Sequence, residues 1–204
     1  MRAALHTGQL RRPVPGGIGR YVQGLLDHLA TGGVDIVPFA GSRWHDAAWH
    51  RFRRPALRLP GEVDVVHAPS LAVPPPGGRP LVVTIHDLAF SYLTPRGAAF
   101  HRRGLGLARA EAAAVVVPSD FTAAEVTAAG IERGRIHVVP HGIDPPPEPP
   151  PGAVAGRRKA LGLADAFVLG VGTLEPRKGL DVLAEAAAGS GLPLVLAGPP
   201  GWGE

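Results

Sequence analysis

The sequence predicts an α/β fold: a doubly wound parallel sheet, followed by the beginning of a second sheet of the same kind. Short apolar runs alternate with amphipathic stretches rich in Ala and Leu, a pattern typical of βα units that feed a parallel sheet. The chain has 204 residues. At about 150 residues per domain, this length holds one whole domain and part of another. With 45% hydrophobic residues, the composition supports a packed core.

Six apolar runs, and the stretches between them, predict the first domain. Apolar residues with the spacing of one helix face predict a helix over 17–30, and Ser119 is suited to cap a helix that runs to Ala129. The predicted strands are 3–6, 34–39, 63–66, 81–85, 114–117 and 135–139, with a further helix over 97–113. Together these elements predict a complete Rossmann-like domain over residues 1–143.

A proline-rich segment over 144–152 then interrupts the pattern. Consecutive prolines support neither a helix nor a sheet ladder, so this segment is predicted to be an extended, semi-rigid linker. The βα rhythm restarts with a helix over 157–161, a strand over 167–171, a helix over 179–188 and a strand over 194–197. Two strands make only part of a parallel sheet, so residues 153–204 are predicted to be an incomplete second Rossmann-like domain.

Composition excludes several classes of protein. Cysteine is absent, which excludes disulfides, thiolate zinc sites and a cysteine nucleophile. No apolar run approaches about 20 residues, and the N-terminus lacks a signal-peptide core, so a soluble cytoplasmic chain is predicted. The formal net charge is +4, but aromatic residues are only 5% and the arginines are scattered. A nucleic-acid partner is therefore not expected.

Glycines follow the first predicted strand and lead into a helix. Gly16, Gly17 and Gly19 would let the backbone approach a ligand closely, and the free N–H groups of a first helical turn favour an anion such as a diphosphate. The alternative is that the turn needs glycine only for its geometry. The dinucleotide fingerprint does not fit, because Val22 stands where its third glycine would be.

Histidines lie near the ends of three predicted strands. His67 follows the third strand, His86 and Asp87 follow the fourth, and His141 follows the sixth. The carboxyl ends of parallel strands share one edge of the sheet, so these side chains are predicted to face one crevice. The alternative is a structural role for each histidine. Metal binding is disfavoured because His67, His86 and His141 have no i, i+4 spacing among themselves.

In the second domain, Arg177 and Lys178 come just after a strand and before a helix. Adjacent cations at this position suit phosphate oxygens. The alternative is a solvated basic pair.

Five motifs in this order resemble those of the family-4 retaining glycosyltransferases of GT-B fold, the mannosyltransferase-like branch in particular. They are GGIGRY at 16–21, TIHD at 84–87, VPSDFT at 117–122, VPHGID at 139–144 and GTLEPRKG at 172–179. The resemblance implies a two-domain enzyme that moves a mannose-like hexose from a nucleotide diphosphate sugar to an acceptor. It implies retention of configuration, and neither a metal nor a cofactor besides the nucleotide sugar.

The resemblance also implies roles for individual residues. Donor diphosphate binding falls to Gly16, Gly17, Gly19, Arg177 and Lys178, and the catalytic residues would be His86, Arg177 and Lys178. Sugar and acceptor binding falls to Tyr21, His67, His86, Asp87 and His141. His141 departs from the family pattern, where Asn is common. The family's Glu-rich donor motif is missing because the chain ends before it, so the 204 residues alone are expected to lack turnover.

The segment 44–58 interleaves arginine with aromatic residues. The favoured interpretation is an irregular surface connection between the second and third strands. The alternative is a short basic helix with Trp44, Ala48 and Phe52 on one side, in weak peripheral contact with the inner membrane face. That alternative would suit a lipid-linked acceptor rather than a glycan or small molecule.

A second function remains open at this stage. The chain could be a non-catalytic module that binds a phosphorylated ligand at 16–19, or an inactive fragment. An open reading frame that continues for about 150 residues of βα pattern favours the transferase.

Overall fold

The computed structural model describes residues 1–200 except 12–15, 55–56, 58, 60 and 94–97. The chain divides into two compact units, Met1–Gly142 and Ile143–Glu204, which we call the N-terminal and C-terminal units. Residues 144–150 between the regular elements form neither helix nor strand.

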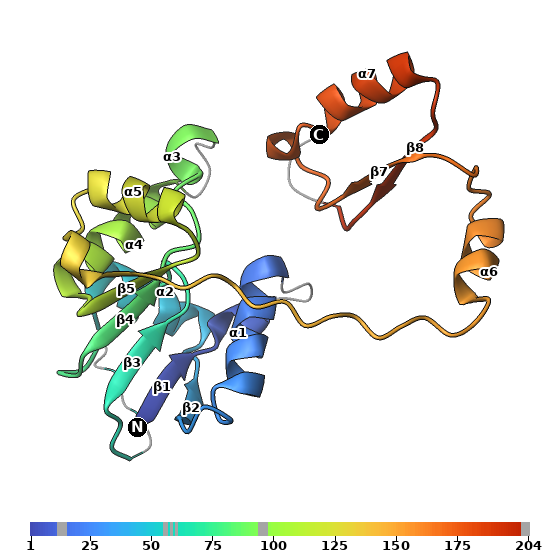
Figure 1. The fold of residues 1–204 in the computed structure, drawn as a ribbon. Helices are drawn as coiled ribbons and strands as arrows, with labels where there is room; N and C mark the ends of the chain where they lie inside the picture. Colours follow the sequence, from blue (N-terminus) through green and yellow to red (C-terminus); the bar gives the residue numbers. More distant parts are fainter. Residues whose placement is uncertain (12–15, 55–56, 58, 60, 94–97, 201–204) are drawn as a thin grey trace. The chain divides into compact units, whose positions relative to one another are not determined.

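The described residues of the N-terminal unit form a six-stranded, fully parallel sheet in the order β2-β1-β3-β4-β5-β6 (Figure 1). The strands are β1 Arg2–His6, β2 Asp35–Phe39, β3 Val65–Ala68, β4 Leu81–Thr84, β5 Ala114–Val117 and β6 Ile136–Val138. The predicted α/β class with a parallel sheet is confirmed. β1 lies between β2 and β3, so the chain reverses its progress across the sheet there. This point is where open parallel sheets bind ligands.

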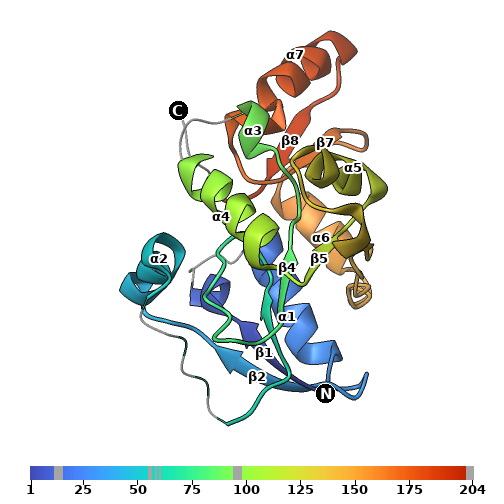
Figure 2. The same cartoon turned by 90° about the vertical axis from the view of Figure 1, so that its left-hand side faces the viewer.

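Helices connect the strands. They are α1 Gly16–His28, α2 Arg43–Phe52, α3 Phe90–Leu93, α4 Ala98–Glu111 and α5 Asp120–Ala128, with 3₁₀ turns η1 Gly8–Arg11 and η2 Arg133–Arg135. The β1–β2 connection crosses the sheet in the opposite direction to β4–β5 and β5–β6. Right-handed crossovers therefore put α1 on one face and α4 and α5 on the other (Figures 1 and 2). The predicted cap is confirmed, because Ser119 Oγ accepts from the Thr122 amide at 3.2 Å.

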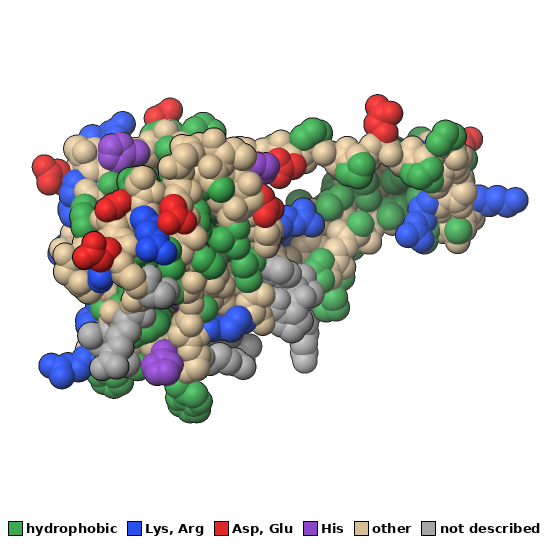
Figure 3. Space-filling model, turned by 90° about the horizontal axis from the view of Figure 1, so that it is seen from below, with side chains coloured by type: hydrophobic (Ala, Val, Ile, Leu, Met, Phe, Trp, Pro, Cys, Tyr) green, Lys and Arg blue, Asp and Glu red, His purple; other side chains and the backbone are tan. Residues whose placement is uncertain are grey.

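The core explains why the strands read as apolar runs. Side chains on both faces of the sheet are buried under helices, as parallel sheets require. The fully buried strand residues are Ala4, Leu5, Val66, Ala68, Leu81, Val83, Thr84, Val115 and Val117. The outer surface is mixed in charge: on the face of the N-terminal unit that Figure 3 draws, acidic and basic side chains are interspersed. Among the described residues, no helix has the length and hydropathy to cross a bilayer.

The third strand lies two residues later than predicted. β3 pairs through Ala3–Val65 and Leu5–His67 on one side, and through Val66–Leu81 and Ala68–Val83 on the other. Hydrogen bonding to two neighbours sets its bounds, whereas the apolar run alone begins at Val63. His67 therefore lies inside the strand rather than after it.

The favoured interpretation of 44–58 as an irregular connection is wrong over its first half, because Arg43–Phe52 is the helix α2. Ser42 and His45 cap each other's backbone, and Arg53 ends the helix in the left-handed region with φ of 57°. Burial of Trp49 then stabilises the helix, which the interleaved arginines and aromatic residues did not indicate. The helical alternative is correct over this stretch, and Trp44 and Phe52 are exposed.

In the C-terminal unit, β7 Val168–Val171 pairs in parallel with β8 Leu194–Ala197. The other elements are α6 Ala153–Ala160, η3 Pro176–Lys178 and α7 Leu180–Ser190. The helix predicted over 157–161 begins four residues earlier, after Gly152 turns the chain in the left-handed region.

We expect amide hydrogens of 153–200 to exchange faster with solvent than those of the six-stranded sheet. Among the described residues of the C-terminal unit, only Glu175 and Ala187 are buried, and little buried apolar surface means a low free energy of local opening. Hydrogen exchange followed by mass spectrometry measures this. Equal protection in β7 and β4 would contradict the expectation.

Candidate functional site

One buried hydroxyl joins two side chains at the carboxyl edge of the sheet. Thr84, the last residue of β4, is fully buried. Its Oγ1 lies 3.1 Å from the Tyr21 hydroxyl and 2.9 Å from His67 Nε2. Tyr21 of α1 and His67 of β3 therefore both contact the last residue of β4.

His86 and His141 meet beside them. His86 Nδ1 lies 3.0 Å from His141 Nε2, and His86 Nε2 lies 3.0 Å from the Pro69 carbonyl oxygen. A carbonyl oxygen only accepts, so the neutral His86 ring donates through Nε2 and accepts from His141 through Nδ1. The Tyr21 ring packs against both imidazoles, with centroids 5.0 and 4.8 Å away. We call Tyr21, His67, Thr84, His86 and His141 the histidine cluster.

Burial disfavours the charged forms of His67, His86 and Tyr21. It lowers the pKa of His67 to about 4, with a further contribution from His86. Burial likewise lowers the pKa of His86, where the neighbouring His141 adds to the effect and the Pro69 hydrogen bond opposes it. The pKa of Tyr21 is raised by burial. Neutral donors and acceptors suit the hydroxyl groups of a sugar better than they suit a phosphate.

Stability is expected to depend on His67 between pH 6.5 and about 4, its unfolded and folded pKa values. The unfolded chain binds this proton more readily, so the free energy of unfolding falls as pH falls through that window. At about 1.4 kcal/mol per pKa unit, the effect reaches about 3 kcal/mol at most. Urea unfolding of the protein and of His67→Gln across this range measures it. An equal pH slope in both would contradict a depressed pKa.

Asp87 lies in the turn that follows β4. Its carboxylate accepts from the Ala89 amide at 3.0 Å. Its charge opposes the lowering of the His86 pKa. Asp87 therefore influences His86 through its charge.

The predicted glycines lie at the start of α1. Gly16, with φ of +64°, and Gly17 are exposed, and a Cβ on either would meet no atom of the described residues within 4 Å. Gly19 is buried inside the helix. The first turn of α1 thus has open space around the two glycines that begin it.

The predicted cation pair lies in the C-terminal unit, in the 3₁₀ turn η3. Lys178 is exposed, and its amide bonds to the Glu175 carbonyl at 3.0 Å. Gly179 then turns the chain in the left-handed region, so α7 begins at Leu180, after the pair. The Arg177 side chain lies outside the described part of the structure.

Sequence reasoning missed Thr84 and the Pro69 carbonyl as members of the site. Thr84 is a polar residue at the end of an apolar strand, which is a detectable signal. Pro69 contributes only its backbone, so no side-chain pattern could identify it.

Comparison with known proteins now decides the family. The model of Glycosyltransferase Family 4 matches residues 36–146, more than half of the chain. The chain belongs to Glycosyltransferase Family 4. The resemblance stated from the motifs is thereby confirmed at the level of the family.

This family-4 chain is also similar to individual proteins. It is 29% identical over 242 residues to the D-inositol 3-phosphate glycosyltransferase of Acidothermus cellulolyticus, covering 91% of the chain but 53% of that protein. It spans about half the length of this curated relative. Crystal structures of Anabaena Alr3699/HepE with UDP and with UDP-glucose match with TM-scores of 0.60 and 0.65 at 19% and 20% identity. The match covers 100% of this chain and 62% of each HepE chain, and it confirms the GT-B type of fold.

Proposed function

We propose that the protein carrying this chain transfers a mannose-like hexose from a nucleoside diphosphate sugar to a hydroxyl acceptor, with retention of configuration and without a metal ion. The observation that carries the proposal is the hydrogen-bonded histidine cluster near the reversal point of a family-4 sheet. The relative's name, D-inositol 3-phosphate glycosyltransferase, and the HepE complexes with UDP-glucose support this class of reaction. A cytoplasmic location belongs to the same proposal.

The cluster can hold the transferred sugar through the pair His86 and His141. A sugar hydroxyl both donates and accepts, so one inserted between these rings accepts from His141 and donates to His86. Tyr21, His67 and Asp87 would border the acceptor, His67 acting through Thr84 rather than by exposed contact.

The reaction separates charge at the donor. The bond between the sugar C1 and the diphosphate oxygen breaks, and its electron pair goes to that oxygen. The acceptor oxygen bonds to C1, and its proton passes to the departing diphosphate. In a retaining transfer, the new bond lies on the face that the diphosphate leaves. The exposed first turn of α1, at Gly16 and Gly17 with Gly19 behind them, and the cations Arg177 and Lys178 would stabilise the departing diphosphate.

Replacing His86 with alanine tests the proposal. We expect sugar transfer by the full-length protein to fall about tenfold or more, because hydrogen-bonding groups aimed at the transferred sugar are lost. Affinity for the free nucleoside diphosphate should stay within about twofold. Transfer of labelled hexose measures the first effect, and calorimetric titration the second.

His137→Ala is the matched control, since His137 is an exposed histidine of β6. Unchanged transfer in both variants would reject the role of the cluster. Full-length protein that binds nucleoside diphosphate sugars without transferring or hydrolysing them would reject the enzyme in favour of a binding module.

A further inference from the structure

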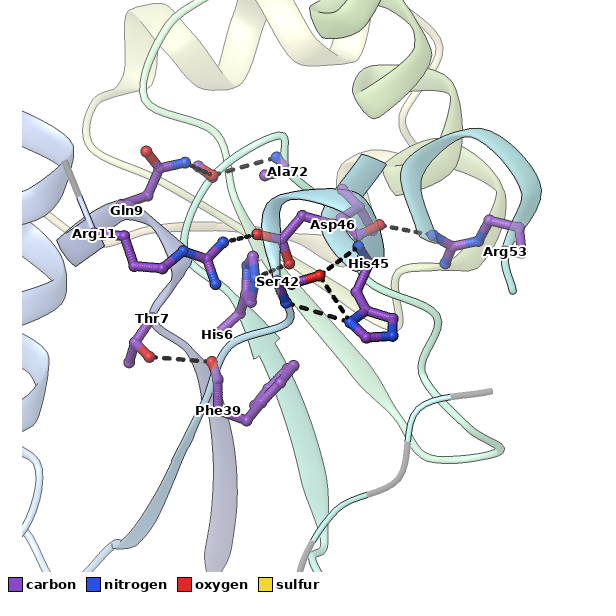
Figure 4. Close-up of polar contacts among 12 residues, drawn as sticks. His6, Thr7, Gln9, Arg11, Phe39, Ser42, His45, Asp46, Arg53 and Ala72 are labelled. Atoms are coloured by element: carbon purple, nitrogen blue, oxygen red, sulfur yellow. Dashed lines mark hydrogen bonds and ion pairs between the residues drawn. The ribbon is translucent and has the colours of Figure 1, made fainter. Parts of the chain in front are cut away.

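A cavity of about 310 Å³ lies in the N-terminal unit at the end of β1. This volume is within the range of pockets that hold small ligands. Its lining includes the side chains of His6, Gln9, Arg11, Asp46, Trp49 and Phe100. These come from β1, η1, α2 and α4. Figure 4 shows His6 and Arg11 directed at Asp46, whereas Gln9 bonds to Ser70. Neither the predicted site residues nor the family motifs include any of them.

The polar wall carries balanced charge. Asp46 lies 3.3 Å from His6 Nε2 and is paired with the Arg11 guanidinium. Burial alone would raise the pKa of the Asp46 carboxyl, but His6 and Arg11 outweigh it and hold that pKa below its usual value. Among the described residues that line the cavity, Arg11 is the one cationic side chain apart from histidine and Asp46 the one anionic side chain. A wall with this balance favours an uncharged ligand that both donates and accepts over an anion such as phosphate.

Two glycines make room for this carboxylate. A Cβ at Gly8 would lie 2.9 Å from His6 Nε2 and 3.1 Å from an Asp46 oxygen. A Cβ at Gly41 would lie 2.9 Å from the other Asp46 oxygen and 2.9 Å from the Trp49 ring. All four distances are shorter than almost all real Cβ contacts. A side chain at position 8 or 41 would therefore displace the groups around Asp46.

The apolar walls are held by hydrogen bonds from outside the cavity. The Arg53 guanidinium donates to the carbonyls of Val73 at 2.7 Å and Pro74 at 2.9 Å, and it pairs with Glu111. His50 stacks on Phe100 with ring centroids 3.9 Å apart, and its Nε2 lies 3.0 Å from the Phe100 carbonyl oxygen. A ligand therefore meets walls that are already in place, which lowers the entropic cost of binding.

The cavity and the histidine cluster share one segment of chain. Pro69 accepts from His86, and the next residue, Ser70, accepts from Gln9 Nε2 at 3.2 Å. Ala72 then lines the cavity. A molecule in the cavity would therefore contact the same segment of chain to which His86 is hydrogen-bonded.

We propose that this cavity binds one uncharged, hydroxylated ring of the acceptor, a hexopyranose or a cyclitol. Its hydroxyls would bond to Asp46, Arg11 and Gln9, and its apolar C–H surface would lie on Trp49 and Phe100. The word acceptor rests on the proposed function, whereas ring binding does not. The cavity thus selects the acceptor by its hydroxyl pattern.

The test is ring binding by the 204-residue chain in the absence of a donor. Methyl α-D-mannopyranoside and myo-inositol are titrated separately, with saturation-transfer NMR as the readout. The two arms distinguish a sugar from a cyclitol. We expect saturable binding of at least one ring, about tenfold or more weaker in Asp46→Asn, because that variant loses a charged hydrogen-bond acceptor.

Asp35→Asn is the matched control, because Asp35 forms an exposed ion pair with Arg2 in the same unit, away from the cavity lining. It should bind the ring within about twofold of the unaltered chain. Circular dichroism verifies that each variant folds. If Asp46→Asn does not fold, Gln9→Ala takes its place and should weaken binding several-fold.

Three results would overturn the proposal: no binding of either ring, binding that Asp46→Asn or its replacement leaves unchanged, or displacement of the ring by inorganic phosphate. Failure of the proposed function looks different. If the full-length protein shows no transferase activity but its ring binding still depends on Asp46, the proposed transfer reaction is rejected. The proposed ring site then still stands.

Discussion

Replacing Lys178 with alanine in the full-length protein is expected to lower sugar transfer about tenfold to a hundredfold. Lys178 is exposed in the turn before α7. In the proposed reaction its ammonium would contact a diphosphate that gains charge as the glycosidic bond breaks. One charge-assisted hydrogen bond contributes about 1.5 to 3 kcal/mol, which gives this range of rates. Inhibition by the free nucleoside diphosphate should weaken as well, because that product carries the same phosphates.

Lys159→Ala is the matched control. Lys159 is the other lysine of the chain and is exposed on α6. Initial rates at varied donor concentration, with and without nucleoside diphosphate, separate turnover from affinity. Unchanged rate and unchanged inhibition in Lys178→Ala would show that this lysine is only a solvated surface charge.

Replacing Gly104 with alanine is expected to destabilise the N-terminal unit by about 1 to 3 kcal/mol. A Cβ there would lie 2.2 Å from the Leu71 carbonyl oxygen and 2.8 Å from its Cβ. The obstacle is backbone, so α4 must move away from the segment that follows β3. The higher helix propensity of alanine, about 1 kcal/mol, offsets only part of this cost.

Gly106→Ala provides the control in the same helix. A Cβ at Gly106 meets nothing within 4 Å, so this change should stabilise the unit by up to about 1 kcal/mol. Urea unfolding monitored by circular dichroism gives both values. Changes of the same sign in the two variants would contradict direct packing of α4 on Leu71.

The Gly104 contact also bears on function. Leu71 lies in the short segment whose Pro69 accepts from His86 and whose Ser70 accepts from Gln9. A shift of this segment would move both the histidine cluster and the cavity. We therefore expect residual folded Gly104→Ala to bind the ring more weakly than Gly106→Ala does.

The sequence by itself determined the parallel α/β class and much of the element pattern. Continuous apolar runs are typical of parallel strands, so β5 and β8 were predicted at the bounds observed, 114–117 and 194–197. The cap at Ser119 was also predicted from the sequence, because its hydroxyl accepts a hydrogen bond from an amide only three residues away. Such features depend on local chemistry, which a sequence displays directly. The five motifs likewise indicated the family.

Only the tertiary structure decided how the site is assembled. The Thr84 hydroxyl joins Tyr21 and His67 from positions 63 and 17 residues away along the chain. The bounds of β3 depend on two neighbouring strands, and α2 is stabilised by the burial of Trp49. The cavity around Asp46 draws its walls from β1, η1, α2 and α4. Each of these features is a contact between distant residues, and the free energy of such a contact exists only once the chain has packed.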